Sequence, residues 1–542
     1  MTKATRDLCS VFLVLALVAI LPAHAQTYTD MFDFLDANGC CPSYPGLLAQ
    51  GRDGNLYGTT QNGGTHALGT FFVVNPSTGL LSTLYNFDGT HGQYPQAGLA
   101  MGFDGNFYGT TYLGGASPSE GVLFKITPGG TLTVLHSFAN TTDGAYPRQP
   151  PIPAPDGNLY GITGNGTNYI VYRVTPSGTF TPIATPPGYS YAPLLLASDG
   201  KLYGVTNYGG TYNGGTIFQL TLGKTPKLKI IYSFGGSAGT GMNPTGGLMQ
   251  ASDGKLYGTT PNGGNSSGGV VFQVTTGGVY KVLHSFAAAA PATDGYGSVA
   301  GLVQGSDGFL YGVNPNGGAG GFGTLFKINS TGKTFQVLHN FDGVTGAGPT
   351  STPILHTNGK IYAMTTSGGA FHQGVVYSLD NALKPFASLF VTWSGKVGTS
   401  VGVLGQGFSN ATAVKFGTGP GTFVAANDTY MTAAVAAGAT TGHVTVLEPG
   451  GNLASPQTFK VVPTISGFSP SSGPVGTSVV ITGMSLSQTT AVKFGGIKAT
   501  AFTVNSDTQV TATVPTAAKT GKIAVPTKGG TATSAATFTV TP

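Results

Sequence analysis

The chain has 542 residues, of which 88 are glycine and only 8% are charged. Its formal charge of +5 is uneven, because residues 26–385 hold 14 basic and 15 acidic side chains while residues 386–542 hold 8 and 3. This C-terminal excess is mild and dispersed, without the basic clusters that nucleic-acid binding requires, so we expect no nucleic-acid partner. Glutamate is nearly absent, and short runs of Thr, Val, Tyr and Phe recur, which predicts an all-β protein.

Residues 1–25 have the composition of an export signal. Lys3 and Arg6 precede an apolar run over residues 8–21, and the small-residue sequence Ala-His-Ala follows at residues 23–25. The apolar run is shorter than the ~20 residues that a membrane-spanning helix needs. We therefore expect a cleaved signal peptide, a mature chain without a membrane span, and an extracellular or cell-surface location, with the periplasm as the alternative.

Only two cysteines, Cys40 and Cys41, remain after this segment is removed. No disulfide framework can then hold the protein together. Adjacent Cα atoms lie ~3.8 Å apart, below the ~4.4 Å minimum that is usual for a bridged pair, so a bond between them would be strained. Two interpretations stay open: a strained vicinal disulfide with a redox or ligand-binding role, and a loop pair without a special role.

One sequence motif, DGNLYGTT in its first copy, occurs seven times with a period of about fifty residues. The copies begin at Asp53, Asp104, Asp156, Asp199, Asp253, Asp307 and Asn358. Such a period, built from strands and Gly-rich turns, is typical of propeller blades, because one small sheet cannot bury its own faces and needs neighbours.

The second repeat predicts four short strands, over residues 97–101, 106–111, 121–127 and 131–138, with Asp-Gly and Pro-Gly-Gly turns between them. Four antiparallel strands per repeat form a propeller blade. The expected fold is therefore a seven-bladed β-propeller over residues 26–385, with the first strand of each blade innermost.

Two segments compete to complete the last blade. Residues 28–34 (YTDMFDF) are similar to the fourth strand of other repeats, whereas residues 385–391 (PFASLFV) directly follow the seventh repeat. We favour the N-terminal segment as the closing strand and keep the second as the alternative.

A different repeat occupies the C-terminal part of the chain. Residues 395–417 (GKVGTSVGVLGQGFSNATAVKFG) return as residues 473–495 (GPVGTSVVITGMSLSQTTAVKFG). Short alternating strands and Gly, Pro and Asn turns predict two small Ig-like β-sandwich domains, over residues 386–462 and 463–542.

These motifs resemble two bacterial families. The seven DGxLYG units, each followed by an Asn-Gly-Gly-like loop, a GxxF strand and an LxSF strand, are similar to the tandem repeat named for Gloeobacter and Verrucomicrobia, found in exported proteins. The tail, with GTSVVITG and VKFG, resembles tandem IPT/TIG domains. The resemblance implies spacer or interaction modules in the tail, and it supplies no catalytic residues.

The repeated polar residues have a structural interpretation. Each turn Asp precedes Gly, where its side chain accepts backbone hydrogen bonds, and Asn358 replaces it without charge in the seventh unit. The tyrosine four residues later has the same strand phase in every unit, which predicts packing between blades. His136, His284 and His339 share a fourth-strand position with tyrosines of other units, so we expect rim packing and no metal ligation.

Residues that depart from the repeat are better ligand candidates. Loops between second and third strands, and loops between blades, are expected to open on one face of the ring. Tyrosine offers a flat apolar face and a hydroxyl, which suit a sugar or a peptide. The candidates on these loops are Tyr94, Tyr112, Tyr146, Tyr189, Tyr191, Tyr208, Tyr212, Tyr296, His66, His91, Arg148 and His372.

We expect no cofactor and no metal site. Four carboxylates precede Gly in inter-blade loops, which leaves calcium as an alternative, but no DxDxDG run occurs. They are Asp88, Asp143, Asp294 and Asp342.

Catalytic signatures such as HExxH, GxSxG and a Walker loop are missing, and no catalytic residue is assigned. We expect an exported, non-catalytic binding or adhesion protein whose partner is a polysaccharide or a cell-surface or matrix protein. The alternatives are a carbohydrate-active lyase or hydrolase with its site at the channel mouth, and a structural component of the envelope or matrix. The sequence leaves the oligomeric state open.

Overall fold

The computed structural model describes residues 26–42, 46–116, 120–140, 142–164, 169–223, 225–237, 239–288, 292–390 and 393–542. The expected signal peptide lies outside this part. Among the described residues the protein is all-β, and the helical segments are two 3₁₀ turns, Asp36–Asn38 and Phe408–Asn410. None of the helices in these ranges is long and apolar enough to cross a membrane.

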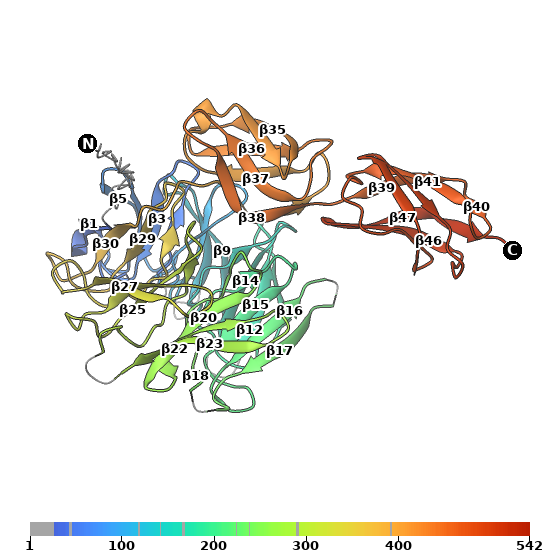
Figure 1. Cartoon of the computed structure of the whole chain (residues 1–542). Helices are drawn as coiled ribbons and strands as arrows, with labels where there is room; N and C mark the ends of the chain where they lie inside the picture. Colours follow the sequence, from blue (N-terminus) through green and yellow to red (C-terminus); the bar gives the residue numbers. More distant parts are fainter. Residues whose placement is uncertain are drawn as a thin grey trace, which may run out of the picture.

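Seven four-stranded antiparallel sheets, here numbered by repeat, follow one another within residues 27–380 of the described chain (Figure 1). Sheets 1 to 3 consist of β2 (Ala49–Gln50), β3 (Leu56–Thr60), β4 (Thr70–Val74) and β5 (Leu81–Asn86); β6 (Ala100–Met101), β7 (Phe107–Thr111), β8 (Val122–Ile126) and β9 (Leu132–Ser137); and β10 (Ile152–Pro153), β11 (Leu159–Gly164), β12 (Tyr169–Val174) and β13 (Phe180–Ala184).

Sheets 4 to 6 have the same strand order. They consist of β14 (Leu195–Leu196), β15 (Leu202–Thr206), β16 (Thr216–Thr221) and β17 (Lys227–Ser233); β19 (Met249–Gln250), β20 (Leu256–Thr260), β22 (Ser267–Val274) and β23 (Tyr280–Ala287); and β24 (Val303–Gln304), β25 (Leu310–Asn314), β26 (Thr324–Ile328) and β27 (Phe335–Asn340). A separate pair joins β18 (Gly241–Met242) to β21 (Asn262–Gly263). The first strands are shorter than the sequence predicts, at two residues each.

Sheet 7 takes its fourth strand from the N-terminal end of the described chain. It consists of β28 (Ile354–Leu355), β29 (Ile361–Met364), β30 (Val375–Asp380) and β1 (Thr27–Asp33). β1 pairs antiparallel with β30, from Thr27 opposite Asp380 to Asp33 opposite Val375. The N-terminal closing strand that we favoured is the one observed, and the competing segment contributes β31 (Ser388–Phe390) to the next domain instead.

The succession of sheets closes on itself through a shared core. Tyr362 and Val376 of sheet 7, with Phe34 directly after β1, pack in one buried cluster with Leu56 and Phe72 of sheet 1. Between other neighbours the first strands touch, as β2 with β6 and β24 with β28 do. The large buried side chains therefore lie between sheets, as the packing of repeated units requires.

Two β-domains follow the repeat region. In the first, one sheet has the order β31, β33 (Ser400–Leu404), β36 (Tyr430–Val435), β35 (Gly419–Ala425), β34 (Ala413–Phe416), β37 (Gly442–Leu447), β38 (Leu453–Val461), β32 (Ser394–Gly395). In the second, one sheet has the order β39 (Thr464–Ser469), β41 (Ser478–Met484), β45 (Gln509–Thr513), β44 (Phe502–Ser506), and the other the order β40 (Ser472–Gly473), β47 (Gly530–Val540), β46 (Gly521–Thr527), β42 (Lys493–Phe494), β43 (Ile497–Lys498).

The two domains share a topology. The order β31-β33-β36-β35 in the first corresponds to β39-β41-β45-β44 in the second, and the parallel pair β32–β38 corresponds to β40–β47. Figure 1 shows the first domain, in orange, against the repeat region and the second, in red, beyond it.

Candidate functional site

Two sets of loops lie together on one face of the repeat region. Loops between sheets form β-bridges with the loop that joins the second and third strands of the following sheet, as Gln93 does with Leu113, Tyr296 with Asn316 and Ala347 with Ser367. The expectation that both loop sets open on the same side is therefore confirmed. We call this side the loop face.

The first C-terminal domain docks on the turns that join first and second strands. The Thr429 hydroxyl donates to the Arg52 carbonyl at 2.7 Å, and the Gln406 side-chain amide donates to the Thr357 hydroxyl at 2.8 Å. The Arg52 guanidinium also lies 4.4 Å from the centre of the Tyr430 ring. This docking uses a different set of loops from the loop face.

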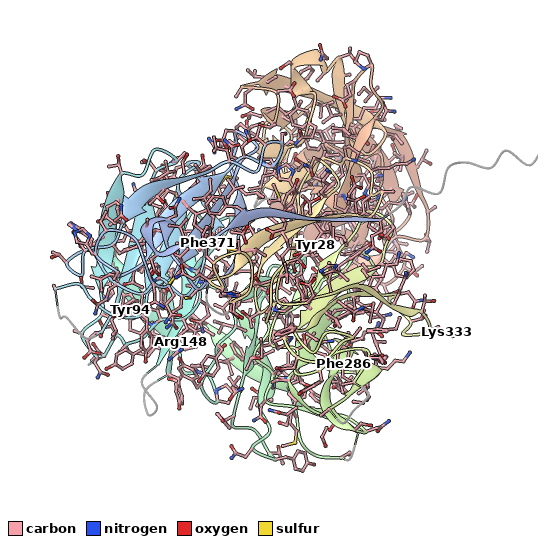
Figure 2. All side chains as sticks on the ribbon, turned by 90° about the vertical axis from the view of Figure 1, so that its left-hand side faces the viewer. Tyr28, Tyr94, Arg148, Phe286, Lys333 and Phe371 are labelled. Atoms are coloured by element: carbon pink, nitrogen blue, oxygen red, sulfur yellow. The ribbon has the colours of Figure 1, made fainter. Side chains whose placement is uncertain are left out.

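Arg148 is the centre of an aromatic cluster on the loop face. Its guanidinium carbon lies 4.3 Å from the ring centre of Tyr112 and 5.4 Å from that of Tyr191. Tyr112 packs against Tyr146 with ring centres 5.3 Å apart, and Tyr191 meets Tyr189 edge to face at 4.6 Å. Four predicted tyrosines and the predicted arginine thus form one site, which we call the Arg148 cluster. Figure 2 labels Arg148 and, close by, Tyr94.

The polar surroundings of the guanidinium are sparse. Arg148 Nη1 donates to Gln96 Oε1 at 3.1 Å, while its Nε is buried and has no hydrogen-bond partner among the residues that the structure describes. No ion pair in the described part of the chain includes Arg148. Burial raises the pKa of the Tyr189 phenol, and the neighbouring guanidinium opposes that rise. Burial, with the Glu120 carboxylate, raises the pKa of Tyr146. These phenols therefore stay neutral near pH 7.

The cluster reflects the register of the repeats. Gln96, Arg148 and Tyr191 each lie eight residues before the turn Asp of their own unit. Equivalent side chains of three consecutive units therefore meet, and Gln96 is a member of the site that our candidate set missed. Its place in the repeat is the signal that could have identified it.

The remaining candidates are dispersed over the loops. Tyr208 and Tyr212 are the most exposed of the predicted tyrosines, with 55% and 56% of their surface accessible. The Tyr94 amide donates to Leu68 and its carbonyl accepts from Tyr112, which places its backbone beside the cluster. The Tyr296 backbone pairs with Asn316 in a loop of sheet 6.

The three candidate histidines are exposed and make local contacts. His91 Nδ1 lies 2.7 Å from Asp88 Oδ2, and His66 Nδ1 lies 3.2 Å from the Thr65 hydroxyl. His372 has a left-handed backbone with φ of 59°. Beside it, Phe371 is 54% exposed, an aromatic side chain that the sequence interpretation missed.

The structural interpretation of the turn Asp and the following Tyr is confirmed. In the fifth repeat, Asp253 Oδ1 accepts from the Lys255 amide at 3.0 Å and Oδ2 accepts from the Tyr257 hydroxyl at 2.8 Å. Burial would raise the pKa of this carboxyl, but these hydrogen bonds hold it below its usual value. Asn358 makes the equivalent pair of contacts, to Lys360 and Tyr362.

The rim histidines pack as expected. His136, His284 and His339 stack on an aromatic ring of the next sheet's fourth strand, with ring centres 4.3, 4.0 and 3.7 Å apart. The stacking partner of His339 is Tyr28 in β1, so the closing strand supplies the same contact as the other fourth strands.

The loop carboxylates are engaged by their own surroundings. Asp143 and Asp294 lie 2.9 and 3.0 Å from the Nε2 atoms of His136 and His284, and Asp342 accepts backbone N–H groups of its turn. Within the described ranges, no three His, Cys, Asp or Glu side chains gather in a group that could hold a metal ion.

Cys40 and Cys41 are free thiols in this structure, with sulfur atoms 3.0 Å apart. That separation exceeds the ~2.05 Å of a disulfide bond. Burial raises the pKa of the Cys40 thiol, which disfavours its reactive thiolate. The vicinal disulfide stays a prediction.

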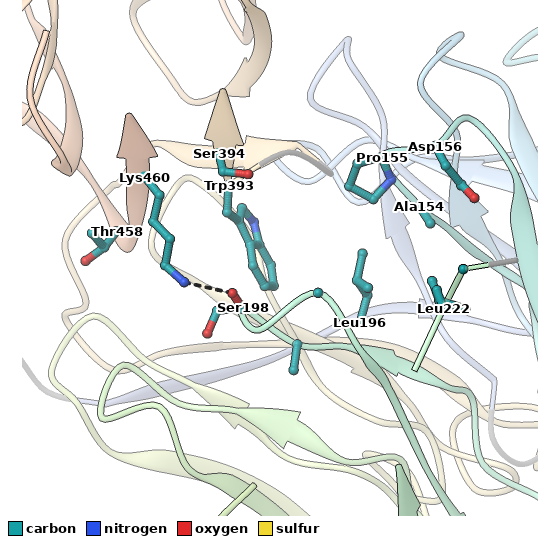
Figure 3. Close-up of a pocket in the computed structure, with 13 residues that line it drawn as sticks. Ala154, Pro155, Asp156, Leu196, Ser198, Leu222, Trp393, Ser394, Thr458 and Lys460 are labelled. Atoms are coloured by element: carbon teal, nitrogen blue, oxygen red, sulfur yellow. Dashed lines mark hydrogen bonds between the residues drawn. The ribbon is translucent and has the colours of Figure 1, made fainter. Parts of the chain in front are cut away.

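A cavity of about 470 Å³ lies between the repeat region and the first C-terminal domain (Figure 3). Trp393, the only tryptophan of the chain, contributes one wall, and Leu196 and Pro155 contribute apolar surface from the repeat region. Lys460 Nζ donates to the Ser198 carbonyl at 2.9 Å across this gap.

Comparison with family models agrees with the motifs. Residues 18–188 and 189–424 match the Gloeobacter/Verrucomicrobia repeat, and residues 463–540 match the IPT/TIG domain. The chain belongs to the Gloeobacter/Verrucomicrobia repeat family. The TIG match covers the second C-terminal domain, whereas the second repeat match ends inside the first. A search of curated proteins finds no match.

Solved structures that this repeat-family chain is similar to share little sequence. A fungal alcohol oxidase in complex with copper is 14% identical over 78% of this chain and 98% of its own, with a TM-score of 0.47. A putative 6-phosphogluconolactonase from Bacteroides uniformis is 19% identical over 59% and 89%, with a TM-score of 0.41. A surface glycan-binding protein from Prevotella bryantii is 16% identical over 27% and 38%, with a TM-score of 0.22. No ligand or activity is carried over from them.

Proposed function

We propose that this protein is an exported binding or adhesion protein whose Arg148 cluster holds a glycan or protein ligand. Four tyrosines and one arginine converge on the loop face, and this convergence is the observation that carries the proposal. Aromatic faces with a few polar groups are typical of ligand sites, and Tyr and Arg are enriched where binding energy concentrates.

The architecture that supports this role is a seven-bladed propeller over residues 26–385 followed by Ig-like domains over residues 386–462 and 463–542. Seven four-stranded sheets and the core shared by the last and first sheets support the ring. The common strand order of the two C-terminal domains supports a duplicated TIG-like fold. These domains act as spacer or interaction modules, and the first leaves the loop face accessible because it docks on the turns.

The test exposes the purified full-length protein to immobilised cell-wall and environmental polysaccharides and records both retention and released sugars. Retention without release supports a binding role, and release favours a carbohydrate-active enzyme. Failure to retain any polysaccharide argues for a protein partner or a structural role.

Paired variants locate the site. Replacing Tyr189 and Tyr191 with Ala removes two walls of the cluster and should weaken retention at least tenfold. Replacing Tyr208 and Tyr212 with Ala removes equally large but more exposed rings and should leave retention within twofold. The opposite ranking would place the site on the outer loops.

A further inference from the structure

The charge at the centre of the cluster is not a requirement of the fold. Five of the other six units have an uncharged residue at the position of Arg148, eight residues before the turn Asp or Asn: Gln96, Tyr191, Thr245, Val299 and Thr350. Neutral and even apolar side chains therefore satisfy the packing of this position. The positive charge of Arg148 is therefore a feature of the third unit that packing of the repeats does not require.

The guanidinium has donor capacity that its surroundings do not use. An arginine carries five N–H donors in a planar fork. Gln96 and the Tyr189 hydroxyl supply neutral acceptors, and the rings of Tyr112 and Tyr191 lie against the guanidinium. Among the described residues, Nε is buried without a hydrogen-bond partner. A partly buried cation without a counter-ion favours an anion that brings two acceptor oxygens in one plane, which a carboxylate does.

The surroundings of the charge narrow the class of anion. Tyr146 and Tyr189 extend the site with flat apolar rings and hydroxyls, which suit the CH face and the hydroxyl groups of a pyranose. One cation matches a sugar residue that carries one negative charge, whereas nucleic acids, with one charge per ~1.7 Å of duplex, bind clusters of basic residues. This inference rests on the loop-face binding proposed above. We propose that the Arg148 cluster recognises the carboxylate of a uronic acid residue in an acidic polysaccharide.

The experiment compares oligogalacturonate with its methyl ester by isothermal titration calorimetry on the full-length protein. The ester keeps the sugar ring, removes the negative charge and adds one methyl group, so we expect its affinity to fall at least tenfold. Arg148→Gln, which installs the side chain found at residue 96, should bind oligogalacturonate at least tenfold more weakly than the wild type. Arg148→Lys, which keeps the charge without the planar fork, should fall between them.

Lys333→Gln is the matched control, because it also removes one positive charge but from an exposed turn between third and fourth strands. Its affinity should stay within twofold of the wild type, and unchanged melting temperatures exclude unfolding as the cause of any loss.

Four outcomes overturn the inference. Equal binding of acid and ester, or equal losses in the Gln variants at positions 148 and 333, would remove the role of Arg148 while loop-face binding stands. Preference for a sulfated galactan over oligogalacturonate would replace the carboxylate with a sulfate ester. Binding of an acidic peptide while no polysaccharide binds would overturn the saccharide proposal itself.

Discussion

The turn Asp of the repeated motif makes the same hydrogen bonds in each copy. In each of its six copies the carboxylate accepts a backbone N–H two residues later and the hydroxyl of the following repeat Tyr. The seventh copy replaces it with an amide that makes the same two contacts with one donor reversed. The hydrogen bonds, more than the charge, therefore explain the repetition.

This view predicts the ranking of two substitutions at Asp253. Asp253→Asn creates the NGK turn of the seventh repeat and should change the free energy of unfolding by no more than ~0.5 kcal/mol. Asp253→Ala removes both acceptors and should cost ~1–3 kcal/mol. Denaturant unfolding curves measure the difference, and equal losses in both variants would assign the stabilisation to the charge.

His356 couples the seventh sheet to the first through a buried contact. The residue is 1% exposed, Nε2 donates to the Gly54 carbonyl at 2.9 Å, and Nδ1 accepts from the Asn358 amide at 3.1 Å. Burial lowers the pKa of this imidazole below its usual value, so the folded state holds the neutral form. The stabilisation is therefore present above pH ~6.5 and decreases as the pH falls below that value.

We expect the wild type to lose more stability than His356→Gln when the pH is lowered from 7.5 to 5. The variant keeps an N–H donor, has no titrating group at this position, and should be less stable at pH 7.5 with a flatter pH profile. Burial also lowers the pKa of His284 and His339 and raises that of Asp30 to about 6. These three groups are present in the wild type and in the variant, so they do not contribute to the difference between the two profiles. Parallel melting profiles would contradict the assignment.

At the scale of elements, β1 acts as the closing strand of sheet 7. Tyr28 stacks on His339 with parallel rings, and its hydroxyl donates to the Thr345 carbonyl at 2.6 Å. These contacts attach the N-terminal strand to sheets 6 and 7 at the rim.

Tyr28→Ala should therefore cost ~2–4 kcal/mol of stability, because it removes a packed ring and a hydrogen bond. Thr29→Ala, on the exposed side of the same strand, should change it by ~0.5 kcal/mol or less. Thermal unfolding monitored by circular dichroism gives both values. Similar melting temperatures for the two variants would show that the rim contact does not stabilise the closure.

At the scale of the whole molecule, the single tryptophan reports on domain docking. Trp393 lines the cavity between the repeat region and the first C-terminal domain, beside Leu196. We expect the double variant Arg52→Ala, Tyr430→Ala to weaken docking and shift the emission of Trp393 to longer wavelength as water reaches the indole. Tyr212→Ala, on the loop face, should leave the emission unchanged. An unchanged spectrum in the double variant would mean that docking does not depend on the Arg52–Tyr430 contact.

Much of the architecture could be predicted because each repeat contains its own turns and apolar strand residues. The strand pairing within units, the N-terminal closing strand and the shared loop face all follow from local patterns. The partners of Arg148 do not, because distances between side chains of different units depend on how neighbouring sheets stack. The docking of the first C-terminal domain was also not foreseeable, because Arg52 and Thr357 lie just before the turn Asp or Asn that every repeat has, and the sequence does not mark which of these turns the domain contacts.

The pairing of β1 with β30 also constrains when the first strand can fold. Thr27 and Asp380 lie at opposite ends of the repeat region. The first strand of this region, β1, therefore cannot pair until its last strand, β30, has been synthesised. During that interval the hydrogen-bonding edge of β1 has no native partner, and such unpaired edges are prone to wrong association. Pairings between distant parts of a chain also form slowly. Pairing of β1 is thus expected only after β30 has been made, and a chain cut short before Val375 would have no native partner for its first strand.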